Sequence, residues 1–335
     1  MIVSLEDVCT KSTSNIKQKD IVDNNGIYPI YGASGQIGNI NYFQQKTPYI
    51  GVVKDGAGIG RTLYLPGNSS IIGTMQALIP KENILPKYLY YVVSYMHLEK
   101  YYSGATIPHI YFKNYKREKF NLVSIKEQQK VINLFSLLEN SLNYKKQELN
   151  KLDELIKARF VEMFGDPICN SLNKPVDFFI NVVKLQRGYD LPVKKRNSNG
   201  DIPVFGSNGV LGYHTEFKAK HGIITGRSGT IGNVYREDGK YWPLNTSLFS
   251  VDTHGNNIVY LQYLLQMFRL ERFYNGAGVP TLNRNDVHKQ KIIRTPLELQ
   301  NEFADFVQQV DKSKFENIVY LNKKLLSKII NKIGR

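Results

Sequence analysis

Apolar residues recur at alternating steps of three and four along two long stretches of the chain, and this spacing is typical of coiled-coil helices. The first series is Val131, Phe135, Leu138, Leu142, Leu149, Leu152 and Ile156, interrupted only at Lys145. The second is Phe303, Val307 and Val310, followed after Lys314 by Leu321 and Leu325. We therefore predict two long helices that pack against each other along these residues, which would also serve as an interface for partner proteins.

Each helix is preceded by a start signal. Ser124 and Glu127 form a capping-box pattern, and Thr295 and Glu298 repeat it, with Pro296 at the expected first helical position. Gly165 predicts the end of the first helix because glycine and the Asp-Pro pair that follows it favour helix termination. We expect helices over 124–165 and 295–335.

The remaining stretches contain short apolar runs between turn residues, such as 50–53, 70–79, 222–225 and 247–251. Runs of this kind predict short strands. Each half of the chain therefore has a mixed part rich in strands, followed by one long helix.

The sequence also repeats itself. Residues 28–38 (YPIYGASGQIG) match 202–212 (IPVFGSNGVLG) at an offset of 174 residues, and two further collinear blocks match at an offset of 172 residues. These blocks pair 88–96 with 260–268 and 102–110 with 274–282. We conclude that the chain is an internal duplication.

Duplication and periodicity together predict an α+β fold with a pseudo-two-fold internal repeat. Two similar mixed α/β domains, at 1–123 and 166–294, would be separated by the two helices at 124–165 and 295–335. Because the second mixed domain follows directly on the first helix, we expect the helices to run antiparallel.

The composition adds a strong positive charge. Across 335 residues the formal net charge is +15, while 42% hydrophobic and 22% charged residues are usual for a globular chain. A distributed positive field suits a polyanion such as nucleic acid. The two cysteines exclude a disulfide framework, and the longest apolar stretch, 89–96, is too short to cross a membrane. With no signal-peptide pattern at the start, we expect a cytoplasmic protein that does not bind membranes.

A search for catalytic chemistry finds only weak candidates. The glycine-rich segments 56–61 and 226–232 fit neither phosphate-loop pattern, and tight turns between strands explain them better. Asp238 and Lys240 have a nuclease-like spacing, but Asp-Gly at this point predicts a hairpin turn. The six histidines have no metal-ligand spacing, and the tetrapeptide signatures of amino-methyltransferases do not occur. We predict no catalytic residue and no metal site.

The candidate DNA-contacting residues are cations, amides and hydroxyls near the repeated glycine blocks, because such side chains bind phosphates and base edges. In the first half they are Ser34, Gln36, Lys46, Lys54 and Arg61. In the second half they are Arg187, Lys194, Lys195, Arg196, Ser207, Asn208, His214 and Arg227. We interpret most tyrosines and Trp242 as packing residues.

The order of these blocks resembles one known family. The repeated glycine blocks, GIITGRSGTIGNVY with WPLNTSLF, the pair GATIPHI and GAGVPTL, and the helix ending LIKARFVEMFGDP are together similar to the DNA-specificity subunit of type I restriction-modification systems. The likeness covers nearly the whole chain. It departs in the first half, where 72–76 replaces the WPLNT run at 242–246, and the chain is short for the family.

The resemblance implies a non-catalytic subunit of a methyltransferase and endonuclease complex. Each mixed domain would be a target recognition domain that reads one half of a bipartite double-stranded DNA site, and the helices would set the spacer and dock two methyltransferase subunits. S-adenosylmethionine, ATP and Mg²⁺ would then act in the methyltransferase and restriction/translocase partners, with no cofactor in this chain. Two alternatives remain open from the residues alone: a DNA-cleaving or DNA-modifying enzyme, and a coiled-coil protein adaptor.

Overall fold

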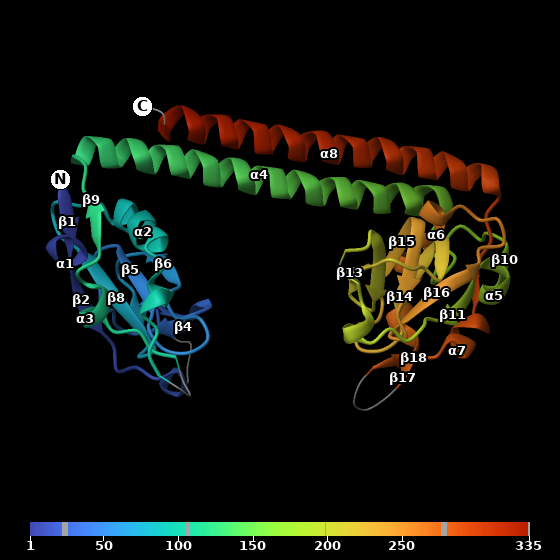
Figure 1. Ribbon diagram of the computed structural model, residues 1–335, viewed down its shortest axis with the longest axis horizontal. Coiled ribbons are helices and arrows are strands. Elements are labelled where there is room, and N and C mark those ends of the chain that lie inside the picture. Colours follow the sequence, from blue (N-terminus) through green and yellow to red (C-terminus); the bar gives the residue numbers. More distant parts are fainter. Residues whose placement is uncertain (22–25, 105–107, 198, 276–279, 334–335) are drawn as a thin grey trace. The chain divides into compact units, whose positions relative to one another are not determined.

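A computed structural model describes residues 1–21, 26–104, 108–197, 199–275 and 280–333, with the side chains of Asn275 and of residues 320–333 outside that description. The chain forms two compact units, Met1–Ser141 (unit 1) and Leu142–Arg335 (unit 2). Figure 1 labels their elements. The boundary between the units falls inside the helix that follows the first mixed part.

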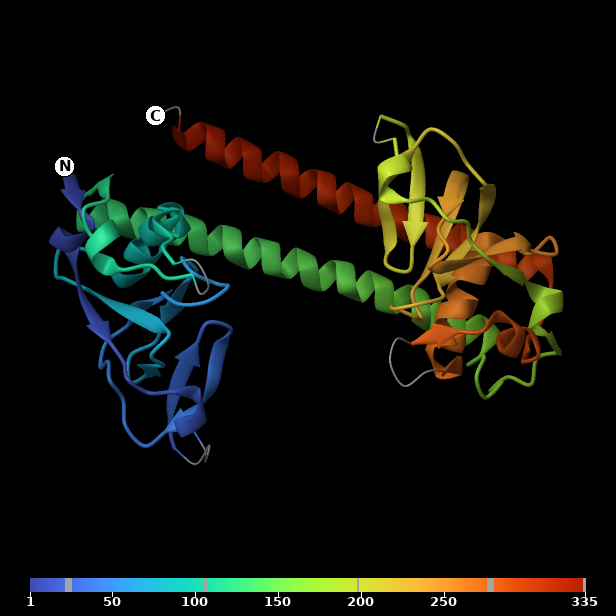
Figure 2. The ribbon, with the colours of Figure 1, turned by 60° about the horizontal axis from the view of Figure 1, so that its bottom comes forward.

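Unit 1 is built from short strands, short helices and the start of one long helix. Its strands are β1 Ile2–Ser4, β2 Cys9–Thr13, β3 Tyr28–Gly32, β4 Gly35–Ile40, β5 Tyr49–Val53, β6 Thr62–Leu65, β7 Ser70–Ile71, β8 Met75–Pro80 and β9 Lys119–Asn121. Its helices are α1 Leu5–Val8, η1 Gln18–Asp20, α2 Pro86–Tyr95, η2 Leu98–Tyr101, α3 Phe112–Tyr115 and the first part of α4 Ile125–Phe164. The sheets have the orders β2-β8-β5-β6, β4-β3-β7 and β1-β9. Figure 2 shows the β3–β4 hairpin at the end of unit 1 remote from α4.

Unit 2 repeats this order of elements. Its strands are β10 Val176–Phe178, β11 Lys184–Arg187, β12 Ile202–Gly206, β13 Gly209–His214, β14 Ala219–Gly226, β15 Val234–Pro243, β16 Ser247–Asp252, β17 Tyr274–Asn275, β18 Thr281–Leu282 and β19 Lys291–Ile293. Its helices are α5 Phe179–Val182, η3 Val193–Lys195, α6 Ile258–Phe268, η4 Leu270–Phe273, α7 Arg284–His288 and α8 Leu297–Ile333, together with the second part of α4. The main sheet has the order β11-β16-β14-β15-β12-β13.

The two sheet systems share one topology, which confirms the predicted duplication and the α+β class. In unit 1, β3 pairs in parallel with β7 and antiparallel with β4; in unit 2, β12 pairs in parallel with β15 and antiparallel with β13. The strand β15 is continuous where unit 1 has β6 and β7 as separate strands, so one sheet of six strands replaces two smaller sheets. Parts of the third repeated block, residues 105–107 and 276–279, lie outside the described residues.

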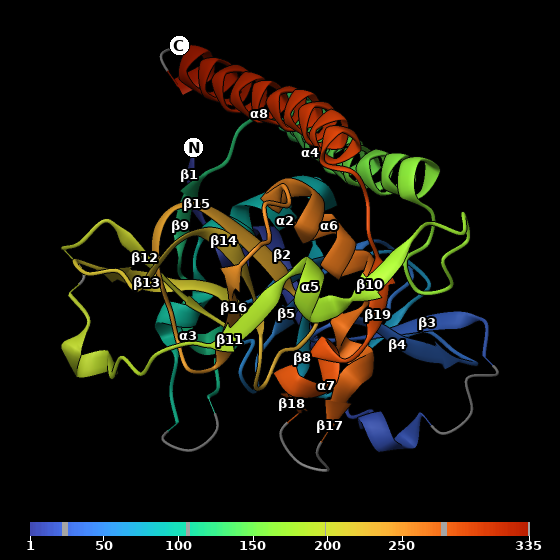
Figure 3. The same ribbon diagram turned by 90° about the vertical axis from the view of Figure 1, so that its right-hand side faces the viewer.

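One helix in each unit joins the sheet to a long helix. Figure 3 shows α6 lying against the sheet of unit 2, where it contacts β14, β15 and α8. The rings of Phe160 and Phe164 on α4 contact Tyr260 of α6 and Phe303 of α8, with centroid separations from 4.9 to 5.9 Å among neighbouring pairs. Such aromatic contacts add to the burial of their apolar surface. In unit 1, α2 lies against β5 and β6 in the same way.

The predicted start of the first long helix is confirmed. The Ser124 hydroxyl accepts a hydrogen bond from the backbone N–H of Glu127 at 3.3 Å. At the second helix, the Thr295 hydroxyl is buried and bonds the Tyr260 hydroxyl at 3.0 Å. The capping role predicted for Thr295 is thus replaced by a tertiary contact. The predicted end is confirmed at Gly165, whose φ of +79° suits a helix-terminating glycine.

Within unit 2, α4 and α8 run antiparallel, as predicted. Arg159 pairs with Glu302 at 3.0 Å, and Lys314 pairs with Asp153 at 2.6 Å. The residue of α4 that comes later in the sequence therefore pairs with the residue of α8 that comes earlier, as antiparallel helices require. Lys145, which interrupts the apolar series, donates to Asn317 at 3.0 Å. The interruption is therefore a polar contact between the two helices.

The predicted helix–helix series needs correction at its first members. Val131 packs on the core of unit 1, and the ring of Phe135 lies 4.8 Å from that of Tyr91 on α2. They contact their own unit because α2 lies against this part of α4, where Lys87 and Tyr91 also bind Glu139 at 3.1 and 3.0 Å. Leu142 is 40% exposed, although the series predicts burial. The other described members of the two series are buried or half-buried. One buried cluster in unit 2 contains Ile156, Phe303, Val307 and Val310, and Leu152 packs against it. Leu138 and Leu149 are half-buried. Leu321 and Leu325 lie outside the described side chains.

One buried glutamine ties each long helix to the short helix before it. Gln128, which is fully buried, accepts from the N–H of Leu85 at 2.8 Å and donates to the carbonyls of Asn83 and Val123, both at 3.0 Å. Gln300, 172 residues later, is 1% exposed. It accepts from the N–H of Asn257 at 2.9 Å and donates to the Thr295 carbonyl at 2.8 Å and the Asn256 side chain at 2.7 Å. The same connection thus forms in both units.

Replacing Gln128 by alanine should lower the free energy of unfolding of unit 1 by about 2–4 kcal/mol, because each buried polar group left without a partner costs about 1–3 kcal/mol. The matched control is Gln129→Ala, which removes an exposed side chain bonded only to Asn133 on the same helix and should cost less than about 0.5 kcal/mol. Urea unfolding followed by circular dichroism measures both. Equal losses in the two variants would contradict the role given to Gln128.

Candidate nucleic-acid interface

Four loops of unit 2 converge at one end of its main sheet. They follow β11, join β12 to β13, follow β14, and join β15 to β16. Backbone hydrogen bonds connect them: the N–H of Tyr189 donates to Pro243 at 2.8 Å, that of Arg227 to Thr246 at 2.9 Å, and that of Leu244 to Phe205 at 2.8 Å. The segments are therefore held together by their backbones.

Two arginines stand at this end, and neither forms an ion pair with any carboxylate among the residues that the structure describes. Arg187 ends β11, where it pairs with Leu248 of β16. Arg227 directly follows β14, whose last residue pairs with the adjacent Ser247 of β16. Burial lowers the pKa of Arg227, and the positive charge of nearby Arg187 lowers it further. Two neighbouring cations favour an anion or an electronegative base edge as their ligand.

The loop after β11 adds further cations. Lys194 and Lys195 are exposed in η3, and the Nε of Arg196 donates to the Leu191 carbonyl at 3.3 Å. Ser207 and Asn208 form the β12–β13 turn, and Asn208 is exposed. Most of the residues predicted in this half thus lie on the converging loops.

The corresponding end of unit 1 forms a cavity of about 700 Å³. Ser34 from the β3–β4 turn and Lys54 from the end of β5 both line it. Arg61 reaches the same turn, where its Nη1 donates to the Ala33 carbonyl at 3.2 Å. The structure therefore brings together three of the five residues predicted in this half. Lys17 also lines the cavity, although the sequence analysis did not select it. It lies on the loop after β2, which corresponds to the basic loop after β11 in unit 2. An alignment of the two repeats could therefore have identified it.

Three of the residues predicted to contact DNA do not join these groups: one in unit 2 lies away from the converging loops, and two in unit 1 do not line the cavity. His214 is 8% exposed; its Nδ1 accepts from the N–H of Asn197 at 3.1 Å and its ring meets that of Trp242 edge-on. The structure gives it a packing role, so we do not place it on the converging loops, and its DNA contact stays a prediction. Lys46 precedes β5, at the opposite end of that strand from Lys54, and its carbonyl lies against Gly67. Gln36 is exposed on β4 and its amide donates to Asn39 at 2.9 Å.

The glycine-rich segments are turns, as predicted. Gly56 and Gly60 have φ of +92° and +80°, and Gly229 and Gly232 have φ of +86° and +97°. Gly60 and Gly232 also lie against the acidic side chains of η2 and η4, leaving no room for a Cβ. These positions need glycine for backbone conformation and close packing.

The predicted hairpin at Asp238 is wrong. Residues 234–243 form one strand, and its register against β14 shifts beside Gly222. The Asp-Gly pair therefore forms a bulge within β15, where Gly239 N–H donates to the Glu237 carboxylate at 2.8 Å. Trp242 is 6% exposed and packs with Leu191 and Val204, which confirms its packing role.

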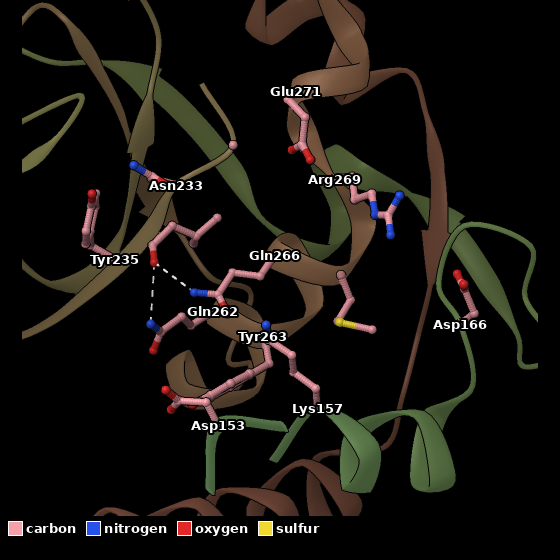
Figure 4. A pocket seen from close by; sticks show the side chains of 13 residues that line it. Asp153, Lys157, Asp166, Asn233, Tyr235, Gln262, Tyr263, Gln266, Arg269 and Glu271 are labelled. Atoms are coloured by element: carbon pink, nitrogen blue, oxygen red, sulfur yellow. Dashed lines mark hydrogen bonds between the residues drawn. The ribbon is translucent and has the colours of Figure 1, made fainter. Parts of the chain in front are cut away.

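A polar cleft of about 710 Å³ opens elsewhere in unit 2, between α4, α6 and the start of β15 (Figure 4). Asp153, Asp166 and Glu271 line it, while the amides of Gln262 and Gln266 donate to the Val234 carbonyl at 3.4 and 3.2 Å. Across the part of the chain that the structure describes, no three His, Cys, Asp or Glu side chains converge as metal ligands. Nor is any described helix long and apolar enough to cross a membrane.

Residues 1–154 and 180–327 match the family model described as the type I restriction modification DNA specificity domain. The chain belongs to this family. The match covers both repeats and confirms the resemblance. The family consists of non-catalytic specificity proteins, so the chain is a DNA-recognition subunit of a type I restriction-modification system. A search of curated protein sequences found no match.

Solved structures support the fold. The S subunit of a type I system from M. genitalium is 15% identical, with a TM-score of 0.62, over 98% of this chain and 94% of its own. A chain from a type I R-M system, described for its complex assembly and conformational transition, is 14% identical with a TM-score of 0.58, over 100% of this chain and 97% of its own.

Lys54→Ala and Lys46→Ala form a matched pair at opposite ends of one strand. Lys54→Ala should weaken binding to all duplexes and reduce the slope of log affinity against log salt by about 1, because one phosphate contact is lost. Lys46→Ala should leave both quantities unchanged. Fluorescence anisotropy of the subunit in complex with its methyltransferase, over a salt series, measures the two slopes. A larger change for Lys46→Ala would overturn the placement of the interface.

Proposed function

We propose that each unit reads one half of a bipartite DNA sequence with the converging loops at its sheet end. The observation that carries this proposal is their duplication: the same strands deliver polar and basic loops to the same end in both units. One chain with two such ends is suited to two separate blocks of bases. The net charge of +15 supplies the sequence-independent attraction to phosphates.

The long helices set the number of unread bases between the blocks and dock two methyltransferase subunits, one for each repeat, since two similar surfaces can each hold one copy. Their antiparallel pairing in unit 2, through Arg159 with Glu302 and Lys314 with Asp153, supports a rigid spacer. Methylation of adenine, translocation and cleavage belong to the methyltransferase and restriction/translocase partners. S-adenosylmethionine, ATP and Mg²⁺ act in those chains, and the complex works in the cytoplasm.

The complex of this subunit with its methyltransferase should bind its target duplex far more tightly than a scrambled duplex. Raising monovalent salt from 50 to 200 mM should weaken binding on the order of 10³-fold, since several phosphate contacts are released together. Competition binding against both duplexes measures the specificity ratio at each salt concentration. A complex without preference for any duplex sequence would contradict the proposal.

A further inference from the structure

The backbone on both sides of Arg227 is held by hydrogen bonds, and its side chain is anchored as well. Its N–H donates to Thr246 at 2.9 Å, and its carbonyl accepts from the N–H of Leu282 at 2.8 Å. The guanidinium Nε donates to the carbonyl of Asn245 at 3.0 Å. A side chain bound in this way has already lost much of its rotational freedom, so it loses less on binding a ligand.

The terminal nitrogens of Arg227 have no acceptor among the described residues. The guanidinium of Arg187 likewise has no hydrogen-bond or ion-pair partner there. Asp190, on the loop that follows Arg187, accepts from the side-chain amide of Asn245. The loops thus hold two like charges close together. Among the described residues no hydrogen bond or ion pair uses the terminal nitrogens of either guanidinium, so both remain available for a ligand.

We infer that Arg227 reads a guanine through its two terminal nitrogens, and that Arg187 binds a neighbouring phosphate. This inference rests on the proposed function of unit 2. The O6 and N7 atoms of guanine in the major groove are two acceptors at the spacing of the guanidinium fork, whereas a phosphate needs no fixed orientation. Arg227 is partly buried and anchored, as readout requires. Arg187 is exposed and ends β11, directly before the loop that carries the cations of η3.

Unit 1 has the same backbone arrangement with a different side chain. The N–H of Lys54 donates to Thr74 at 3.0 Å and its carbonyl accepts from Ile110 at 2.9 Å, as in Arg227. Its ammonium lies 3.8 Å from the Asp55 carboxylate. A lysine held in this way is a point charge without a planar fork. The guanine contact is therefore specific to the half-site of unit 2, and the two half-sites differ.

The test uses the methyltransferase complex and duplexes selected from a random library, whose bound sequences are read out by sequencing. Arg227→Lys should lose discrimination at one guanine of one half-site by about 10- to 100-fold and leave the other half-site intact. Arg187→Ala should weaken all sequences alike, reduce the salt slope by about 1 and preserve the motif. The matched control is Lys184→Ala, an exposed cation at the other end of β11, which should change neither.

A second measurement needs no variant. Replacing that guanine by 7-deazaguanine removes N7 and should weaken binding of the unaltered complex about 10-fold or more. The Arg227→Ala complex should show no additional loss with the altered base. Two results would overturn the inference in a complex that still binds its target specifically. One is unchanged discrimination in the Arg227→Lys complex. The other is undiminished binding when 7-deazaguanine replaces each guanine of the site in turn. A complex that selects no sequence would instead contradict the proposed function.

Discussion

A fully buried glutamine at the start of each long helix fixes how a recognition unit is attached to it. Gln128 and Gln300 satisfy backbone groups on the helix start and on the start of the preceding short helix at the same time. A buried polar group without its partner is costly, so both segments keep one relative position. A reading surface can address a defined base only if its support is rigid, and these contacts provide that rigidity within each unit.

The scaffold and the reading residues are separable. Lys54 and Arg227 occupy matching places, with the same backbone partners in each unit, yet they present different chemistry. The positive φ of the glycines in the adjacent turns maintains the loop path independently of the side chains beside them. A gene duplication can therefore diverge in sequence preference without rebuilding its fold, since exposed loop side chains contribute little to the core.

The sequence was most informative where local chemistry decides the structure. The cap at Ser124, the end at Gly165 and the glycine turns depend on residues close in sequence, and these predictions are confirmed. The repeat is also confirmed, because a comparison of the two halves of the chain reveals it directly. Tertiary contacts decided the rest. His214 carries a polar ring whose burial against Trp242 no spacing rule reveals, and Phe135 fits a helix–helix series but packs on α2 of its own unit.

The buried glutamines show the same limit, because a polar residue in the first turns of a helix is ordinarily solvated. The predicted domain boundaries at 123/124, 165/166 and 294/295 and the base contacts themselves stay predictions. The most direct test of bipartite recognition is a genome-wide map of methylated adenines in cells expressing this subunit with its methyltransferase. We predict one motif of two short blocks with a constant number of unspecified bases between them. A single uninterrupted block, or methylation without sequence preference, would contradict it.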